Sequence, residues 1–179
     1  MKSFVFLLCA ALCLAVATAS TCCPPYWTAH GEFCYRYFGY PRRYVVAEYF
    51  CNQFSSCSGD LAHLASAETE KENDFLYRFI EGLSAELPPQ SVWIGLNDIA
   101  VEGEYVWTDN TQSVFRSWAV DQPAPPDCAA MPGEFATSTW VMMPCAEPLP
   151  YICKMRRQAP QTNQPAMYSA QYFRQQHQH

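Results

Sequence analysis

Cysteine is the residue type whose number and spacing most clearly indicate chemistry in this chain. Of the ten cysteines, Cys9 and Cys13 lie in an N-terminal apolar run, which leaves eight for the rest of the chain. These eight are Cys22, Cys23, Cys34, Cys51, Cys57, Cys128, Cys145 and Cys153. An even number of cysteines in an exported chain is typical of a disulfide framework. The absence of any Cys-x-x-Cys pair removes the commonest zinc-binding spacing, so we expect disulfides.

Carboxylates are the second group that could do chemistry. All 17 Asp and Glu residues lie between Cys22 and Cys153 together with six Lys and Arg, so this stretch carries a net charge of −11. From Lys154 onward the chain has four basic residues and no acidic one. An acidic domain lacks the basic face that nucleic-acid-binding proteins present. We therefore predict cations, and not nucleic acids, as partners of the domain.

A run of acids, which we call the acidic strip, lies where a helix is predicted to begin. It consists of Glu68, Glu70, Glu72 and Asp74. Negative charge at a helix start interacts favourably with the helix dipole. We interpret the strip as a solvated surface that attracts calcium weakly and diffusely, with a dedicated ion site as the alternative. No Ser/His/Asp, Cys/His or phosphate-loop arrangement occurs, so we predict no enzymatic activity and no tightly bound cofactor.

The two ends of the chain predict its compartment. Lys2 precedes an apolar run over 4–17 that ends in small residues, which is the pattern of a cleavable secretory signal over 1–19. A membrane anchor is the alternative, but the run is too short to cross ~30 Å of hydrocarbon comfortably. Residues 156–179 form a basic tail rich in Gln, with two Pro and few aliphatic side chains, and are predicted to be disordered. We expect a secreted protein without membrane association and with one folded domain over 20–155.

Hydrophobic periodicity predicts the elements that must position these groups. Apolar residues at helical spacing predict a first helix over 44–54: Val45, Val46, Tyr49, Phe50 and Phe54. A second helix is predicted after Ser66 as its N-cap. Its buried stripe would be Phe75, Leu76, Phe79, Ile80 and Leu83. Short strands are predicted at 61–65, 92–96, 104–108, 139–143 and 149–154, so the fold class is α+β.

A series of short motifs runs in order through the expected domain. It comprises Cys23-Pro24-Pro25-Tyr26-Trp27, Cys34-Tyr35-Arg36-Tyr37-Phe38, Ala47-Glu48-Tyr49-Phe50-Cys51, Leu61-Ala62-His63-Leu64-Ala65-Ser66, Trp93-Ile94-Gly95-Leu96-Asn97-Asp98, Trp107-Thr108-Asp109, Trp118, Cys128, Trp140, Pro144-Cys145 and Leu149-Pro150-Tyr151-Ile152-Cys153. This order resembles the long form of the C-type lectin-like domain over the whole stretch up to Cys153. The resemblance implies a disulfide-braced fold with two helices, small antiparallel sheets and a long loop region.

The resemblance also implies a disulfide pattern. Its pairs are Cys23–Cys34, Cys51–Cys153 and Cys128–Cys145. Cys22 and Cys57 are left over, and they would either pair with each other or link two chains into a dimer.

Sugar-binding members of this family hold a primary calcium ion, and the resemblance places its ligands at five positions. Calcium prefers about 6–8 oxygen ligands with carboxylates among them. A Glu/Gln-Pro-Asn/Asp motif reads Gln122-Pro123-Ala124 here, and a later Glu position falls at Pro126. A Trp-Asn-Asp motif reads Trp140-Val141-Met142, so only Gln122 offers an oxygen. We therefore expect the primary site, formed by Gln122, Ala124, Val141 and Met142, to be degenerate.

An auxiliary calcium site is less clearly lost. Asp98, Glu102 and Asp127 fall where the resemblance implies ligands of a second ion. The alternative interpretation is that the three are ordinary solvated acids on loops. Weak calcium binding is thus the only metal interaction that the sequence predicts.

Within the fold, the chain most resembles the acidic spicule-matrix proteins of sea urchins. The likeness rests on the start at Cys22-Cys23-Pro24-Pro25-Tyr26-Trp27, on Cys34-Tyr35-Arg36-Tyr37-Phe38-Gly39 and on the Gln- and Pro-containing tail. It implies a matrix component of a calcium carbonate skeleton, with mineral or matrix proteins as partners. The alternative is a secreted lectin that recognises glycans through a non-standard site, for example in defence.

Overall fold

The computed structural model describes residues 23–56, 58–84, 90–133 and 138–157. The expected signal segment, most of the tail, Cys22 and Cys57 lie outside these residues. The described elements are β1 (Thr28–His30), β2 (Phe33–Arg42), α1 (Tyr44–Cys51), β3 (His63–Leu64), α2 (Glu70–Ser84), β4 (Val92–Asn97), β5 (Val106–Trp107), β6 (Cys128–Met131), β7 (Val141–Met143) and β8 (Leu149–Arg156). No helix in the described part is long and apolar enough to cross a bilayer.

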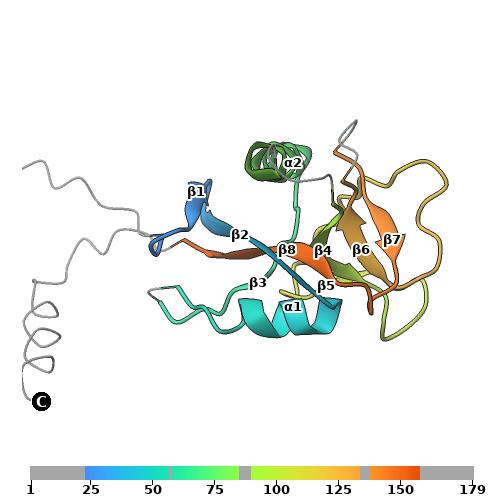
Figure 1. Cartoon of the computed structure of the whole chain (residues 1–179), viewed down its shortest axis with the longest axis horizontal. Coiled ribbons are helices and arrows are strands. Elements are labelled where there is room, and N and C mark those ends of the chain that lie inside the picture. The colour runs from blue at the N-terminus through green and yellow to red at the C-terminus, as the bar shows by residue number, and fades with distance from the viewer. Residues whose placement is uncertain (1–22, 57, 85–89, 134–137, 158–179) are drawn as a thin grey trace, which may run out of the picture. The chain divides into compact units, whose positions relative to one another are not determined.

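The strands form one eight-stranded sheet, which together with α1 and α2 makes up the predicted α+β fold (Figure 1). The main path is β1-β2-β8-β4-β6-β7, with β3 beside β8 and β5 beside β4. All pairs are antiparallel except β4 and β8, which run parallel where Trp93 faces Tyr151. The last strand, β8, ends at Arg156, one residue beyond the boundary expected for the domain.

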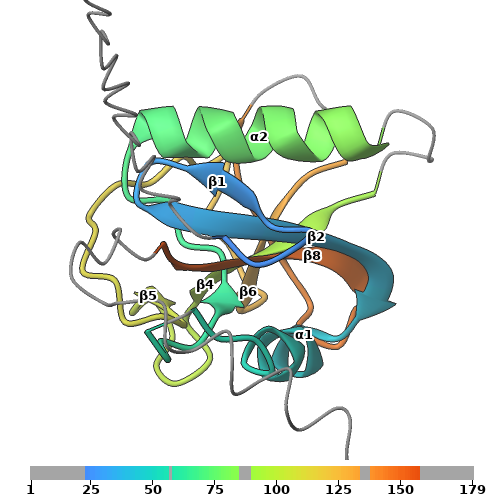
Figure 2. The ribbon, with the colours of Figure 1, turned by 90° about the vertical axis from the view of Figure 1, so that its left-hand side faces the viewer.

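Helix α2 covers one side of the layer formed by β1, β2 and β8, whereas α1 lies on the other side (Figure 2). Leu76 and Ile80 of α2 are fully buried, as predicted, but Leu83 is 48% exposed. The helix begins at Glu70, because the Thr69 hydroxyl accepts a hydrogen bond from Glu72 N at 3.2 Å. The predicted N-cap at Ser66 is therefore wrong.

Helix α1 is shorter than predicted and buries a different face. It ends at Cys51, and its buried residues are Tyr44, Ala47 and Cys51. The apolar side chains that suggested the helix are 38–65% exposed: Val45, Val46, Tyr49 and Phe50. The physical reason is that Tyr44 packs against Trp93 at a ring separation of 5.4 Å and Cys51 is bonded to Cys153, so these two anchors set the rotation of the helix.

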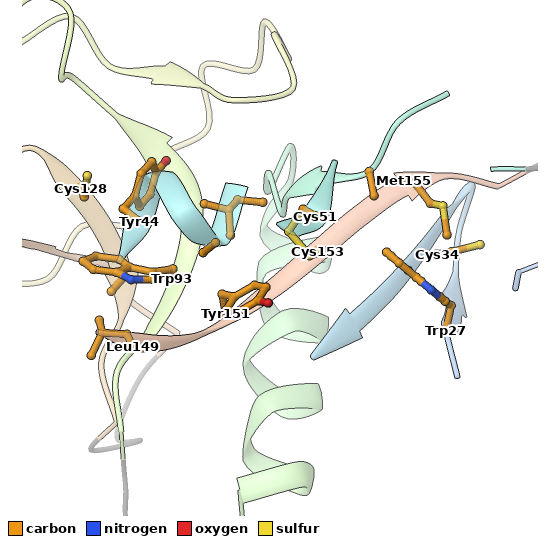
Figure 3. Close-up of a cluster of buried hydrophobic side chains, with 14 residues drawn as sticks. Trp27, Cys34, Tyr44, Cys51, Trp93, Cys128, Leu149, Tyr151, Cys153 and Met155 are labelled. Carbon is orange, nitrogen blue, oxygen red and sulfur yellow. A yellow bond between two sulfur atoms is a disulfide. The ribbon is translucent and has the colours of Figure 1, made fainter. Parts of the chain in front are cut away.

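The structure contains the three disulfides that the family resemblance implies. They are Cys23–Cys34, Cys51–Cys153 and Cys128–Cys145. Figure 3 shows Cys51–Cys153 inside one of the two buried clusters, where it joins α1 to β8. In the same cluster Trp93 is fully buried, and its indole Nε1 donates to the carbonyl oxygen of Arg42 at 2.9 Å. The Cys51–Cys153 disulfide therefore lies within the hydrophobic core.

Gly95 allows β4 to lie against the segment that contains β3. A Cβ atom at Gly95 would lie 2.5 Å from the Leu64 carbonyl oxygen and 2.8 Å from Thr108 Oγ1. The backbone N–H of Gly95 donates to Ala65 O at 2.9 Å, so the two segments cannot separate without losing this bond. Only glycine fits this approach.

We expect Gly95→Ala to lower the free energy of unfolding by about 1–3 kcal/mol, which is the usual cost of an overpacked core. The measurement is equilibrium unfolding in urea with the disulfides intact. Gly82→Ala is the matched control, because a Cβ atom there meets nothing within 4 Å on α2. It should be neutral or stabilise by up to about 1 kcal/mol. Equal stability of the two variants would contradict this account of β4 packing.

Candidate functional site

The residues that the family resemblance implies for a primary calcium ion lie in the long loop region before β6 and in β7. Gln122, whose oxygen is the one expected to survive, accepts a hydrogen bond from the backbone N–H of Met142 at 2.9 Å. Met142 is 7% exposed, and Ala124 and Val141 are partly buried. The amide oxygen of Gln122 therefore holds the loop to β7. The side chains at the other expected positions, Ala124, Val141 and Met142, are apolar. These residues do not fit a calcium ion that needs about 6–8 oxygens.

The auxiliary acids are only partly brought together. Asp98 is 4% exposed, its Oδ2 accepts from Gly103 N at 2.9 Å, and its backbone N–H donates to Asp127 O at 3.1 Å. Glu102 is exposed. Among the described residues, no hydrogen bond reaches the buried Asp98 Oδ1, although the Tyr105 hydroxyl lies near the same carboxylate. No group of three or more His, Cys, Asp or Glu side chains within the described ranges is arranged to hold a metal ion.

The four residues of the acidic strip do not share one surface, and this corrects the interpretation of a continuous solvated face. Glu70 is exposed, and Asp74 is partly buried and accepts from Ser138 Oγ at 3.1 Å. Glu72 is 8% exposed and faces the sheet, and Glu68 is partly buried. The helix turns Glu72 inward because a buried cation, Lys154, lies beneath it.

Lys154 is the centre of a buried ionic cluster that the sequence did not predict. Its Nζ lies 2.7 Å from Glu72 Oε1 and 3.1 Å from Glu68 Oε1, and its side chain is 2% exposed. It also donates to Ser66 Oγ at 3.0 Å and lies 3.8 Å from the centre of the Phe33 ring. A lysine within an otherwise apolar strand, 149–155, was the signal that could have indicated it.

Tyr35 completes this cluster. Its hydroxyl donates to Glu72 Oε1, and its side chain is fully buried. Burial, reinforced by the adjacent Glu72 carboxylate, raises the pKa of Tyr35 well above its ordinary value of 10.0. The Tyr35 hydroxyl therefore stays protonated and acts as a hydrogen-bond donor. Through Tyr35, Glu72 and Lys154 the cluster joins β2, α2 and β8.

A polar pocket of about 380 Å³ opens beside Lys154. Its lining includes Asp60, His63, Glu68, Asp109, Gln112 and Arg156. Asp109 is occupied by internal bonds, because it accepts from Ser66 Oγ at 2.5 Å and from Thr111 N at 2.9 Å. His63 is likewise engaged, with its Nδ1 2.6 Å from Glu48 Oε1. Most of the charged groups here are thus committed to holding the fold together.

The Glu48–His63 pair should make stability depend on pH. The hydrogen bond to Glu48 raises the pKa of His63 above 6.5. Burial alone would raise the pKa of Glu48, but bonds from His63, Leu64 N and Asn52 lower it below 4.5. The histidine contribution is complete below 6.5 and is lost as the pH rises through its raised pKa. The glutamate contribution is complete above 4.5 and is lost as the pH falls through its lowered pKa.

We therefore expect the pair to stabilise most between pH 4.5 and 6.5, the two ordinary pKa values. His63→Gln should remove about 1 kcal/mol in that window. In this variant the free energy of unfolding should also fall less steeply as the pH rises than in the unaltered protein. The measurement is urea unfolding at several pH values. An alkaline decline that is as steep in His63→Gln as in the unaltered protein would contradict this assignment.

A second hollow, which we call the aromatic groove, lies between the end of β1 and α2 and measures about 630 Å³. The imidazole of His30 stacks on Phe75 at 3.9 Å and 6°, and Phe75 is nearly parallel to Phe79 at 5.6 Å and 10°. The polar rim is formed by Glu70, Lys71, Asp74 and Arg78. The sequence did not predict this groove, because His30 and α2 are far apart in the chain.

Comparisons with known proteins add the family context. The family model described as Lectin C-type domain matches residues 42–155. An alpha-N-acetylgalactosamine-specific lectin of Patiria pectinifera is 36% identical over 162 residues, covering 81% of this chain and 95% of that protein. Echinoidin of Heliocidaris crassispina is 34% identical over 143 residues, covering 75% and 97%.

Two solved structures have the same fold. The C-type lectin CEL-I of Cucumaria echinata superposes with a TM-score of 0.69 at 25% identity, covering 76% of this chain and 99% of that one. Ovocleidin-17, described as a major protein of the Gallus gallus eggshell calcified layer, superposes with a TM-score of 0.63 at 28% identity. That match covers 75% of this chain and 99% of ovocleidin-17.

Proposed function

Because this chain belongs to the C-type lectin domain family, we propose that it is a secreted, non-enzymatic lectin that binds glycans without a primary calcium ion. The observation that carries the proposal is the bond from Met142 N to Gln122 Oε1, which occupies the one surviving ligand among apolar neighbours. The alpha-N-acetylgalactosamine-specific lectin of Patiria pectinifera, 36% identical to this chain, supports glycan recognition as the role.

Export is supported by the covalent structure. Three disulfides within a domain of this size are typical of proteins that mature in an oxidising compartment. This agrees with the secretory signal expected over 1–19. The proposed site of action is therefore extracellular.

We expect glycan binding by the full mature protein to be unchanged within about twofold when millimolar calcium is replaced by a chelator. The measurement is a glycan array read with and without calcium, followed by chromatography on mannose and galactose resins. Retention on either resin that requires calcium and ends on chelation would contradict the proposal. Lack of binding to any glycan would reject the lectin function itself.

The triple variant Ala124→Asp, Val141→Asn and Met142→Asp is a test of the degenerate site. It should not gain calcium-dependent retention, because Met142 is buried and the loop is tied to β7 through Gln122. A charged residue at a buried position costs free energy unless it is paired. The same variant should therefore unfold at lower urea concentration than the unaltered protein.

A second candidate function is that of an extracellular matrix component of a calcium carbonate skeleton. It is favoured by the net charge of −11 between Cys22 and Cys153 and by the likeness to ovocleidin-17. Exposed acids lie on α2 and on several turns and loops: Glu32, Asp60, Glu70, Glu81, Glu102, Glu104, Asp121 and Glu147. Such a surface would concentrate calcium diffusely, and salt would screen it over ~8 Å at physiological ionic strength.

The two functions differ in where the protein accumulates and in how it binds calcium. A matrix protein should adsorb to calcite at low salt and bind several calcium ions weakly, with less binding at high salt. Neutralising Glu102, Glu104 and Glu147 together should weaken the adsorption, whereas the same substitutions should leave glycan binding unchanged. Accumulation in body fluid, with no adsorption to calcite, would reject the matrix function.

A further inference from the structure

We infer that the aromatic groove between β1 and α2 is the glycan-binding site and that it takes a neutral hexose or N-acetylhexosamine. The inference rests on the proposed lectin function and names the place and the class of ligand. The proposed site lies outside the long loop region, on a surface formed by the N-terminal hairpin and α2.

The hairpin that carries His30 is held rigidly. His30 is the last residue of β1, and Gly31 follows with a φ of +55°, which turns the chain into β2. The Cys23–Cys34 disulfide ties the hairpin to the segment before it. The hairpin turn is also tied to the end of β8, because the backbone N–H of Arg157 donates to Glu32 O at 2.6 Å. The position of the imidazole is therefore set before any ligand binds, which lowers the entropic cost of binding.

The groove has an aromatic lining with partly exposed rings. The rings of His30, Phe75 and Phe79 are nearly parallel, and all three residues are partly buried. Phe75 is fixed from below by an edge-to-face contact with Tyr35 at 4.9 Å. Ligand sites combine such apolar walls with a few convergent polar groups. A pyranose suits them because its C–H groups form an apolar patch while its hydroxyls lie around the ring edge.

The polar rim has equal numbers of positive and negative groups. Glu70 and Asp74 offer acceptors, and Lys71 and Arg78 offer donors, so the four have no net formal charge. Sugar hydroxyls both donate and accept, and they can use both kinds of group. Arg78, Lys71 and Glu70 are exposed, so they can reach a ligand in the groove. Within an acidic domain, this balance favours a neutral sugar over a uronate or a sulfated one.

The volume and the exposure of its charged groups Glu70, Lys71 and Arg78 also distinguish this groove from the polar pocket beside Lys154. At about 630 Å³ the groove is larger than the pocket of about 380 Å³ and has room for more than one sugar ring. In the pocket, Lys154, Asp109 and His63 are already bonded to other residues. Recognition of an uncharged ligand there would require breaking those bonds.

The test uses the full mature protein with N-acetylgalactosamine, galactose and glucose as probes, after the glycan array has identified binding. The double variant His30→Ala and Arg78→Ala should weaken binding at least tenfold. Arg78→Glu alone, at an exposed position, should also weaken it at least fivefold. Arg43→Ala, an exposed arginine before α1, is the matched control and should bind like the unaltered protein. Thermal unfolding should be alike for Arg78→Glu and Arg43→Ala.

The outcomes separate the inference from the function on which it rests. If the unaltered protein binds glycans and both groove variants bind equally well, the groove assignment is wrong and the lectin function stands. If the array shows binding only to sulfated or uronic glycans, the neutral class is wrong. If no glycan binds, the lectin function fails and the groove assignment fails with it. Self-association that Arg78→Glu abolishes would assign the groove to a second copy of the chain.

Discussion

Replacing Lys154 with alanine is expected to lower the free energy of unfolding by about 3–5 kcal/mol. The substitution leaves the Glu72 carboxylate buried under α2 without the ammonium group that lies 2.7 Å away. It also removes the donor to Ser66 Oγ and the cation that contacts the Phe33 ring. The loss is large because breaking one side of a buried ion pair leaves an uncompensated charge in the interior.

The measurement is urea unfolding of the disulfide-bonded protein, with two comparisons. Lys154→Met combined with Glu72→Gln removes both charges and should be more stable than Lys154→Ala, since no charge is left unpaired. Arg156→Ala is the matched control, because its ion pair with Glu32 spans 3.7 Å between side chains that are 62% and 82% exposed. That pair should contribute less than about 1 kcal/mol. Similar losses in Lys154→Ala and Arg156→Ala would show that the cluster is not a central element of stability.

Removing the Cys51–Cys153 disulfide by a double alanine substitution should destabilise the protein by about 2–5 kcal/mol. The bond closes a loop with a sequence separation of 102, and a loop of that length loses about 4.7 kcal/mol of denatured-state entropy in the simple model. Both cysteines are fully buried, so their removal also leaves a void between α1 and β8. The bond is thus both the longest-range of the three and the most central.

The Cys128–Cys145 bond provides the comparison within the same chain. Its sequence separation is 17, for which the same model gives about 3 kcal/mol. The Cys128→Ala, Cys145→Ala variant should therefore unfold at higher urea concentration than the Cys51→Ala, Cys153→Ala variant. If the order is reversed, strain or residual structure in the unfolded chain outweighs loop closure. The glycan binding that we propose for the aromatic groove should persist in the 128–145 variant, since neither cysteine lines that groove.

Some of the elements were predictable because their signals are local. The stripe of Phe75, Leu76, Phe79 and Ile80 predicted α2, since its residues share one side of a helix that packs on the sheet. The strand β6 was not predicted, because all four of its residues are buried and its sequence lacks the alternation of a half-exposed strand. The helix α1 was predicted with the wrong buried face, because its anchors, Trp93 and Cys153, lie outside the helix itself.

The sequence by itself was enough to indicate the family, and the family resemblance implied the three disulfide pairs and predicted that the primary calcium ligands are missing. These properties depend on which residues occur and in what order, and Ala124, Val141 and Met142 lack oxygen donors in their side chains in any conformation.

Only the tertiary structure decided which charged and aromatic groups meet. It turned Glu72 from a predicted surface acid into the buried partner of Lys154, and it placed His30 on Phe75. Both contacts join segments that are distant in the chain, and both depend on the rotation of α2 about its own axis. A helical pattern predicts that rotation only approximately, whereas a buried ion pair and a stacked ring require one definite orientation.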